Sequence, residues 1–340
     1  MKKITVLLLA LFMLVSALAG CGKQNDTNQT DKLSIVTTIF PEYDWVREIL
    51  GDKADNAEIT MLLDNGVDLH SYQPTADDIV KISDCDLFIY VGGESDEWVE
   101  DALRNAANRN MKVINLLEVL GDSVKTEEIV EGMQEEEHED AEEHEHEDAH
   151  AHEDAEEHEH EEETDEHVWL SLKNAKMLVR VISKALQELD PDNKDIYAAN
   201  ADAYVKKLSA LDAEYQAAVD AASNKTILFG DRFPFRYLVD DYGLHYYAAF
   251  VGCSAETEAG FETISFLAKR VDELKLPCVL TIEGAQHKIA ETIVRNTTAK
   301  NQRVLTMDSM QSTTSKDVKN GTTYLSVMEK NLSVLKEVLR

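Results

Sequence analysis

The sequence predicts an α/β fold of two lobes, each with a mostly parallel four-stranded sheet flanked by helices, joined by a long rigid linker helix. Short apolar runs rich in β-branched residues alternate with amphipathic stretches, which is typical of βα units and parallel sheets. The runs form two sets, one before residue 120 and one after residue 225, with a helical stretch between them. At 340 residues and 44% hydrophobic content, the chain is long and apolar enough for two cores.

The first set of apolar runs predicts four strands, in a lobe that we place at residues 33–190. The runs are SIVTTIF, AEITMLL, DLFIYVGG and KVINLL. One helix is expected from Pro41 to Leu50, because proline is a favourable first helical residue. Another is expected after Thr75, whose hydroxyl can cap a helix that opens with acidic residues.

A long helix is predicted between the lobes, at residues 191–222. Pro191 should end one helix and begin the next, because proline cannot continue a helix. After it, tyrosines and leucines recur at helical spacing without glycine or proline, and a stiff linker of this kind permits little opening. The second lobe is placed at residues 223–340, with strands expected at TILFGD, YYAAFVG, PCVLTIE and RVLTMDS.

The first residues predict export. Residues 1–20 have a short basic end and an apolar run, which is typical of a signal peptide. The following LAGC resembles a bacterial lipobox, so Cys21 is expected to carry acyl chains that anchor the protein at the extracytoplasmic face of the cell membrane. Residues 21–32 would be a flexible tether. Three other cysteines allow at most one disulfide among them, and the sequence leaves open whether Cys253 and Cys278 pair.

The acidity of the chain is concentrated in one segment. The formal net charge is −33, and 20 of the 66 acidic residues lie at residues 135–166, without lysine or arginine. This balance argues against a nucleic-acid partner. The ten-residue sequence HEDAEEHEHE occurs twice, at 138–147 and 152–161, and cannot bury a core.

We therefore predict an acidic, His-rich disordered loop at residues 126–166, which binds metal weakly as an accessory to a site elsewhere. Its seven histidines are His138, His144, His146, His150, His152, His158 and His160. Within the loop, HEDAH matches the H-E-x-x-H motif of zinc peptidases, which makes a zinc-dependent hydrolase the alternative from another class. A tract made of histidine and glutamate gives this spacing by chance and lacks an apolar helix face, so we expect no enzyme.

Four residues near predicted strand ends are candidate metal ligands. His70 lies in the loop DLHSYQP between a strand and a helix, and His167 is embedded among apolar residues before another helix. Asp231 and Asp308 each follow a strand directly, although either could equally cap a helix. Two imidazoles and two carboxylates would make a closed four-ligand site, suitable for zinc or manganese, that binds metal without catalysis.

Taken in order, five segments resemble the metal-specific substrate-binding proteins of bacterial ABC importers, the zinc and manganese group called cluster A-I. They are VTTIFPEYDWVREILGD, GVDLHSYQPTADDIVKISDCDLFIYVGG, HVWLSLKNAKMLVRVISKALQELDP, YAANADAYVKKLSALD, and TMDSM with TTYLSVMEKNL. The resemblance implies metal in the cleft between the lobes, held by His70, His167 and Asp308. It does not supply a third ligand, because GDRFPFRYL departs from the family pattern. Asp231 is our substitute, with Glu258 and Glu283 in reserve.

The same resemblance implies a function. Such proteins capture a metal ion outside the membrane and deliver it to a permease driven by a cytoplasmic ATPase. Zinc is expected, because zinc-type members carry a His-rich insertion at this place and imidazoles favour zinc over manganese. Manganese or iron is the alternative within the family, and a zinc-binding adhesin is a further one. We expect a monomer.

Overall fold

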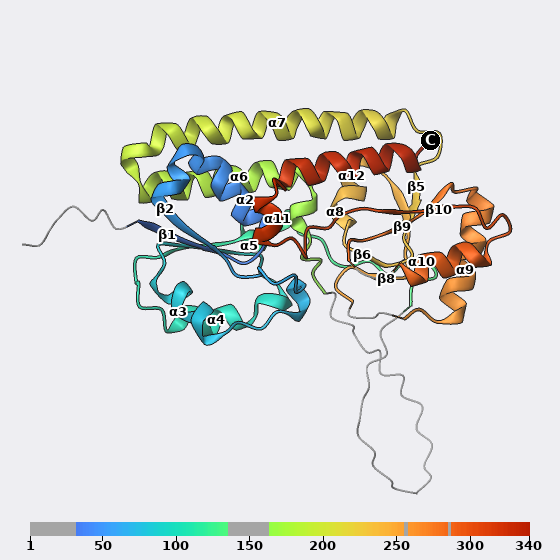
Figure 1. Cartoon of the computed structure of the whole chain (residues 1–340), viewed down its shortest axis with the longest axis horizontal. Coiled ribbons are helices and arrows are strands. Elements are labelled where there is room, and N and C mark those ends of the chain that lie inside the picture. The colour runs from blue at the N-terminus through green and yellow to red at the C-terminus, as the bar shows by residue number, and fades with distance from the viewer. Residues whose placement is uncertain (1–31, 135–162, 255–257, 285–286) are drawn as a thin grey trace, which may run out of the picture. The chain divides into compact units, whose positions relative to one another are not determined.

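A computed structural model describes residues 32–134, 163–254, 258–284 and 287–340 of the chain. Its first sheet is wholly parallel, in the order β2-β1-β3-β4 (Figure 1). The strands are β1 (Leu33–Thr37), β2 (Ala57–Met61), β3 (Leu87–Tyr90) and β4 (Lys112–Asn115). Each coincides with one of the four apolar runs of the first set, and helices cover the sheet. The predicted α/β architecture of the first lobe is therefore confirmed.

Three of the four helices described in this lobe begin where the sequence provides a cap or a proline. They are α2 (Phe40–Leu50), α3 (Ala76–Asp84), α4 (Trp98–Arg104) and α5 (Leu116–Leu120), with single 3₁₀ turns at Gly51–Asn56, Leu69–Ser71, Glu94–Asp96 and Gly121–Ser123. Thr75 and Asp78 form a reciprocal capping box at the start of α3, as the sequence predicts. Helix α2 carries Pro41 in its first turn.

Three long helices pack together on one side of the fold. They are α6 (Leu172–Leu189), α7 (Lys194–Asp220) and α12 (Tyr324–Val338), with 3₁₀ turns at Val168–Leu170 and Pro191–Asn193 before α6 and α7. Helix α7 packs against α6, α2 and α12 and runs alongside both lobes (Figure 1). The Tyr215 hydroxyl, buried on α7, donates to the Met328 carbonyl oxygen at 2.7 Å. The predicted linker helix is thus confirmed, and it is packed along its length rather than free.

The second lobe is also built from parallel strands. Its strands are β5 (Thr226–Leu228), β6 (Arg232–Phe233), β7 (His245–Tyr247), β8 (Phe250–Val251), β9 (Cys278–Thr281) and β10 (Arg303–Thr306), and its remaining helices are α8 (Arg236–Tyr242), α9 (Phe261–Leu274), α10 (Lys288–Asn296) and α11 (Ser315–Lys319). Strand β5 pairs with β7, β6 with β8 and β9 with β10. A parallel bridge between Phe229 and Leu280 joins the pairs, which gives four neighbouring strands, β7-β5-β9-β10.

The apolar core is continuous between the lobes. Leu33–Arg340 form one compact unit, and its larger buried cluster includes Ile35 of β1, Trp169 before α6, Phe229 after β5 and Tyr324 of α12. A smaller buried cluster includes Leu267 of α9 and Ile293 of α10. Separating the lobes would expose the shared apolar surface, so the fold resists wide opening.

The described cysteines, Cys85, Cys253 and Cys278, are all free thiols, which answers the question of pairing that the sequence left open.

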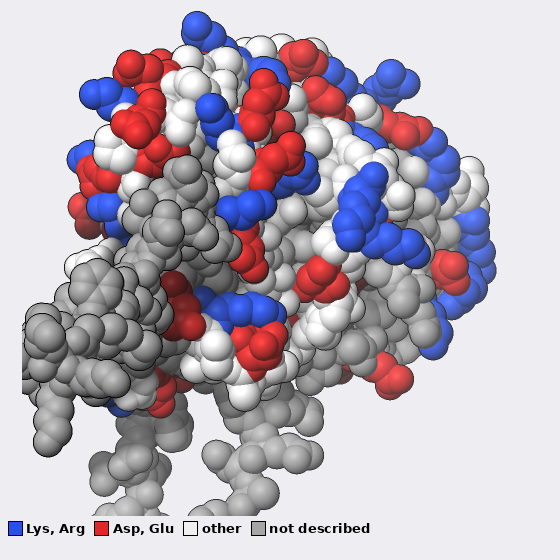
Figure 2. Space-filling model, turned by 60° about the vertical axis from the view of Figure 1, so that its left-hand side comes forward, with Lys and Arg blue, Asp and Glu red and all other residues white. Residues whose placement is uncertain are grey.

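On the face of the molecule in Figure 2, basic and acidic side chains are interspersed. Exposed pairs of this kind, such as Lys81 and Asp77 at 2.6 Å, contribute at most about 1 kcal/mol each. Within the described ranges, no helix has the length and apolarity needed to cross a membrane.

The structure narrows the predicted loop at both ends. Thr126 and Thr164 form an antiparallel bridge, and the Tyr237 hydroxyl accepts from the backbone N–H of Lys125 and donates to the Asp165 carbonyl oxygen. These contacts hold the two ends of the predicted loop in place, although its composition predicted disorder there. The His-rich repeat, the signal peptide and Cys21 lie outside the described residues, and the domain boundaries stay predictions.

Candidate metal site

His70 is held in a tight turn between β2 and α3. The Asp68 carboxylate accepts from the backbone N–H of His70 at 3.1 Å and begins the turn. The ring Nδ1 of His70 lies 2.9 Å from the Ser95 hydroxyl and 3.5 Å from a carboxylate oxygen of Glu166. With acceptors on that side, Nδ1 carries the proton and Nε2 presents its lone pair.

His167 is completely buried, at the turn that precedes α6. One oxygen of Asp165 accepts from its backbone N–H at 2.9 Å and lies 3.0 Å from its ring Nδ1. Val168 and Trp169, which are also fully buried, fix the backbone on the other side. The ring direction is therefore set before any ligand arrives, which is the usual arrangement of a metal-binding histidine and its carboxylate partner.

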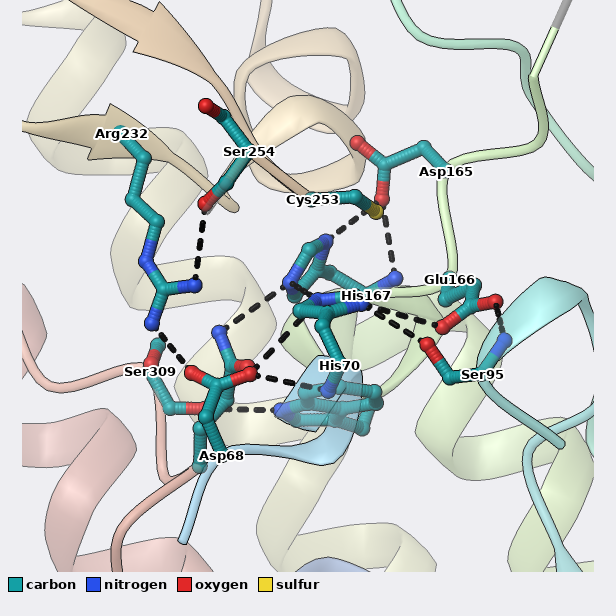
Figure 3. A network of polar contacts seen from close by, with 12 residues as sticks. Asp68, His70, Ser95, Asp165, Glu166, His167, Arg232, Cys253, Ser254 and Ser309 are labelled. Carbon is teal, nitrogen blue, oxygen red and sulfur yellow. Dashed lines mark hydrogen bonds and ion pairs between the residues drawn. The ribbon is translucent and has the colours of Figure 1, made fainter. Parts of the chain in front are cut away.

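The structure brings these two histidines together, although they are far apart in the sequence. Their Nε2 atoms lie 3.2 Å apart, and the two rings lie next to each other, tilted by 57° (Figure 3). Two nitrogens bound to one tetrahedral zinc ion, each at its usual bond length, lie about 3.4 Å apart. The pair thus has the spacing that a zinc ion requires.

A third potential ligand comes from the second lobe. Among the described residues, one group of three histidine, cysteine or acidic side chains has ligand atoms that all lie within 4.8 Å of one another: His70, His167 and Cys253. Cys253 lies two residues after the last residue of β8, Val251, so the loop at this strand end supplies it. It also lines a cavity of about 260 Å³ together with His70 and four glutamates, Glu94, Glu127, Glu163 and Glu166.

The side chain that enters the site after β5 is a cation. Arg232 forms an ion pair with the Asp68 carboxylate and donates to the Ser254 carbonyl oxygen at 3.3 Å (Figure 3). It joins the two lobes next to the histidine pair. Arginine cannot ligate a metal, because its guanidinium stays protonated and has no lone pair to offer.

The two predicted carboxylate ligands do not belong to this group. Asp231 accepts from its neighbour's backbone N–H and from that of Ile282, and Asp308 accepts from Met310. Each therefore caps local backbone, which is the alternative that the sequence left open. In reserve, Glu283 accepts from the Ser309 hydroxyl and the Gln311 backbone, and Glu258 is exposed. The structure shows no ligand contact for these residues, and their metal-binding roles stay predictions.

Gln311 closes the inner side of the histidine pair. With its amide nitrogen toward Asp68, it donates to both carboxylate oxygens at 2.8 Å, and its oxygen accepts from His167 Nε2 at 3.1 Å. This orientation satisfies every polar atom of the amide and requires a proton on His167 Nε2. A cation bound at His167 Nε2 would have to displace that proton.

The electrostatics agree with one shared proton. Burial, and then the charge of His167, lower the pKa of His70 to about 3. Burial acts against protonation of His167 as well, but the carboxylates of Asp165, Asp68 and Glu166 together outweigh it and raise the pKa of His167 above its ordinary value. His70 is therefore the neutral member of the pair, and the one additional proton, with its positive charge, belongs to His167.

The comparison with known proteins is decided by one match over almost the whole fold. The family described as zinc-uptake complex component A, periplasmic (ZnuA), matches residues 35–338. The chain belongs to the ZnuA family.

Several known proteins are similar to this chain over most of its length. The zinc-binding lipoprotein AdcA of Streptococcus pneumoniae is 33% identical over 99% of the chain, which spans 61% of that relative's length. The high-affinity zinc uptake system protein ZnuA of Bacillus subtilis is 31% identical over 97% of this chain and 95% of that protein. A crystal structure of the Zn(II)-bound ZnuA-like domain of S. pneumoniae AdcA is 29% identical, with a TM-score of 0.67, over 91% of this chain and 99% of that one.

Sequence reasoning found His70 and His167 but missed their surroundings. Asp165 stands two residues before His167, so an acidic partner could have been proposed from the sequence. Cys253 follows a predicted strand directly and met the same criterion that selected Asp231 and Asp308. Arg232 and Gln311 gave no such signal, because their part depends on how distant segments meet.

Proposed function

We propose that this protein captures zinc outside the cytoplasm and delivers it to the permease of an ABC importer, driven by a cytoplasmic ATPase. The observation that carries the proposal is the pair of histidine Nε2 atoms 3.2 Å apart, each ring held through its Nδ1 by an oxygen. Membership of the zinc-uptake family and the zinc-binding names of its relatives support it. Imidazole ligands favour zinc over manganese, which supports the choice of metal.

A transport role is favoured over an enzymatic one. The ZnuA family and its relatives are described by uptake and binding. The peptidase-like HEDAH lies outside the described residues. The protein would act as a monomer whose bound zinc is handed to the importer.

The proposed location is the extracytoplasmic face of the cell membrane. The family is described as periplasmic, and AdcA is described as a lipoprotein, which supports export followed by acylation at Cys21. The His-rich tract would then lie on the same side of the membrane as the zinc that it is proposed to collect.

Zinc titration of the full chain against a high-affinity chelating indicator tests the binding step. One site that competes with the indicator is expected, because the weakly binding His-rich tract cannot do so. For the transport step, loss of the encoding gene should slow growth in zinc-depleted medium, and added zinc, but not manganese, should restore it. A chain without a tight zinc site, or equal rescue by both metals, would contradict the proposal.

Zinc affinity should fall as the pH is lowered from about 8 to about 5.5, and competition from the His167 proton contributes up to about tenfold per unit once the pH is below the pKa of His167. The reason is competition: zinc requires the Nε2 lone pair that the proton occupies, and Asp165 raises the pKa at which this proton binds. Competition titrations at each pH, corrected for the indicator, measure the profile.

The Asp165→Asn variant is the test of this explanation. Without the carboxylate charge, the pKa of His167 should drop, so the loss of affinity should begin at lower pH than in the wild type. His245→Ala, which alters an exposed histidine on β7, should leave the profile unchanged. An unaltered profile in Asp165→Asn would show that another group binds the competing proton.

A further inference from the structure

We propose that the thiolate of Cys253 is the third protein ligand of the zinc site, and that it gives the site a preference for zinc and softer divalent cations over manganese. The inference rests on the proposed zinc-binding function and adds a ligand from the second lobe. A bound ion would then be held by both lobes, with two imidazoles from the first and one sulfur from the second.

The position of Cys253 fits this role. Its sulfur and one nitrogen each of His70 and His167 lie within 4.8 Å of one another. Around tetrahedral zinc, a sulfur and a nitrogen ligand are about 3.6 Å apart. A movement of about 1 Å therefore completes the site, and a flexible cysteine side chain at the mouth of a cavity can make it.

The local backbone is built to bring residue 253 close to His167. A Cβ atom at Gly252 would lie 3.1 Å from His167 Nδ1 and 2.9 Å from the Phe233 carbonyl oxygen, so glycine permits this approach. The Cys253 backbone N–H donates to a carboxylate oxygen of Glu127 at 2.8 Å. Glu127 belongs to the segment that pairs with residues 163–165, directly before His167. One network thus positions both ligands.

Cys253 differs from the other described cysteines in its surroundings. Cys85 and Cys278 are buried in the apolar core, where cysteine acts as a small apolar residue. Cys253 is absent from both described core clusters and lines the glutamate-rich cavity beside His70. A packing role explains the first two thiols but not the third.

Burial and the carboxylates of Glu127, Asp165 and Glu166 raise the pKa of the Cys253 thiol, so the thiolate would form only with a bound cation. A divalent cation between two neutral imidazoles needs a negative ligand when it is buried. Asp68 lies nearby, but its carboxylate is already paired with Arg232 and contacted by Gln311. When zinc binds, the Cys253 thiol would release its proton to solvent and form a zinc–sulfur bond. No electron transfer is involved.

A sulfur ligand has a consequence for selectivity. Thiolate binds zinc, cadmium and cobalt well, whereas manganese prefers carboxylate, carbonyl and water oxygens. The site would therefore reject manganese through its ligand chemistry. With this ligand, neither Asp231 nor Asp308 would be required for the site.

Cobalt(II) is the probe for the test, because a cobalt–thiolate bond gives an intense near-ultraviolet charge-transfer band that nitrogen and oxygen ligands lack. The full chain is used with Cys21→Ser as the reference, since Cys21 could bind cobalt itself. One equivalent of cobalt should produce the band. Cys253→Ser should abolish the band, keep the visible cobalt bands and lower zinc affinity by more than about tenfold, whereas Cys278→Ser should keep the band.

The outcomes separate this inference from the proposed function. Cobalt that binds the reference chain without the charge-transfer band, with binding lost in His167→Gln, would overturn the role of Cys253 and leave the histidine site standing. Tight zinc binding, in competition with the high-affinity indicator, that survives His167→Gln would overturn both. If Cys253→Ser fails to fold, the band in a chain with Cys21→Ser, Cys85→Ser and Cys278→Ser decides alone, because Cys253 is then its only thiol.

Discussion

Replacing His167 by glutamine is expected to lower zinc affinity by more than about 100-fold, since changes in the outer partners of metal ligands alone cost about 10- to 100-fold. Glutamine has a similar volume and can still donate to Asp165, which otherwise would be a buried carboxylate without its partner. What it cannot supply is the imidazole Nε2 that lies 3.2 Å from its counterpart on His70. The measurement is competition against a high-affinity indicator, with the full chain.

The matched variants define what this result means. His70→Gln should have a comparable effect, because the two nitrogens would hold the same ion. His245→Gln alters a histidine exposed on β7 and should bind zinc as the wild type does. Wild-type affinity in His167→Gln, with the fold intact by circular dichroism, would place the tight site elsewhere, most directly in the His-rich tract.

The fold could be predicted from the sequence because its signals are local. Each strand of the first sheet is an apolar run between polar segments, and the Thr75 cap and Pro191 mark helix starts that the structure confirms. The run YYAAFVG is less simple, because it divides into β7 and β8, which pair with different strands. Periodicity within one segment cannot reveal such a change of partner.

The site could be predicted only in part, because sequence signals are local and the site is assembled from segments that are far apart in the chain. His70 stands out in the sequence because it lies in the loop DLHSYQP between a predicted strand and a predicted helix. His167 stands out because it lies among apolar residues directly before a predicted helix. The third candidate ligand depends on which side chain the segments after β5 and β8 direct inward. The structure directs Arg232 toward Asp68 and places Cys253 near the histidines, whereas Asp231 turns to backbone groups. A search restricted to histidine and carboxylates could not find that arrangement.

The structure also links metal binding to the stability of the fold, through Trp169. This side chain is fully buried next to His167, with ring centroids 5.3 Å apart. Its indole N–H donates to the Ser309 carbonyl oxygen at 2.8 Å, and its own carbonyl oxygen accepts from the Tyr324 hydroxyl at 2.6 Å. Trp169 thus connects the turn that holds His167 to the loop after β10 and to α12.

Trp169→Ala is therefore expected to lower the free energy of unfolding by about 3–5 kcal/mol, the usual cost of emptying a buried aromatic site. Urea unfolding of the zinc-free protein measures it. Trp169→Phe keeps most of the ring but leaves the Ser309 carbonyl oxygen without its donor, so a smaller loss of about 1–3 kcal/mol is expected. Met177→Ala, at an exposed position on α6, should change stability by less than about 0.5 kcal/mol. If Trp169→Ala were no less stable than Met177→Ala, the shared core would not be what holds the two lobes, and with them the two histidines, in place.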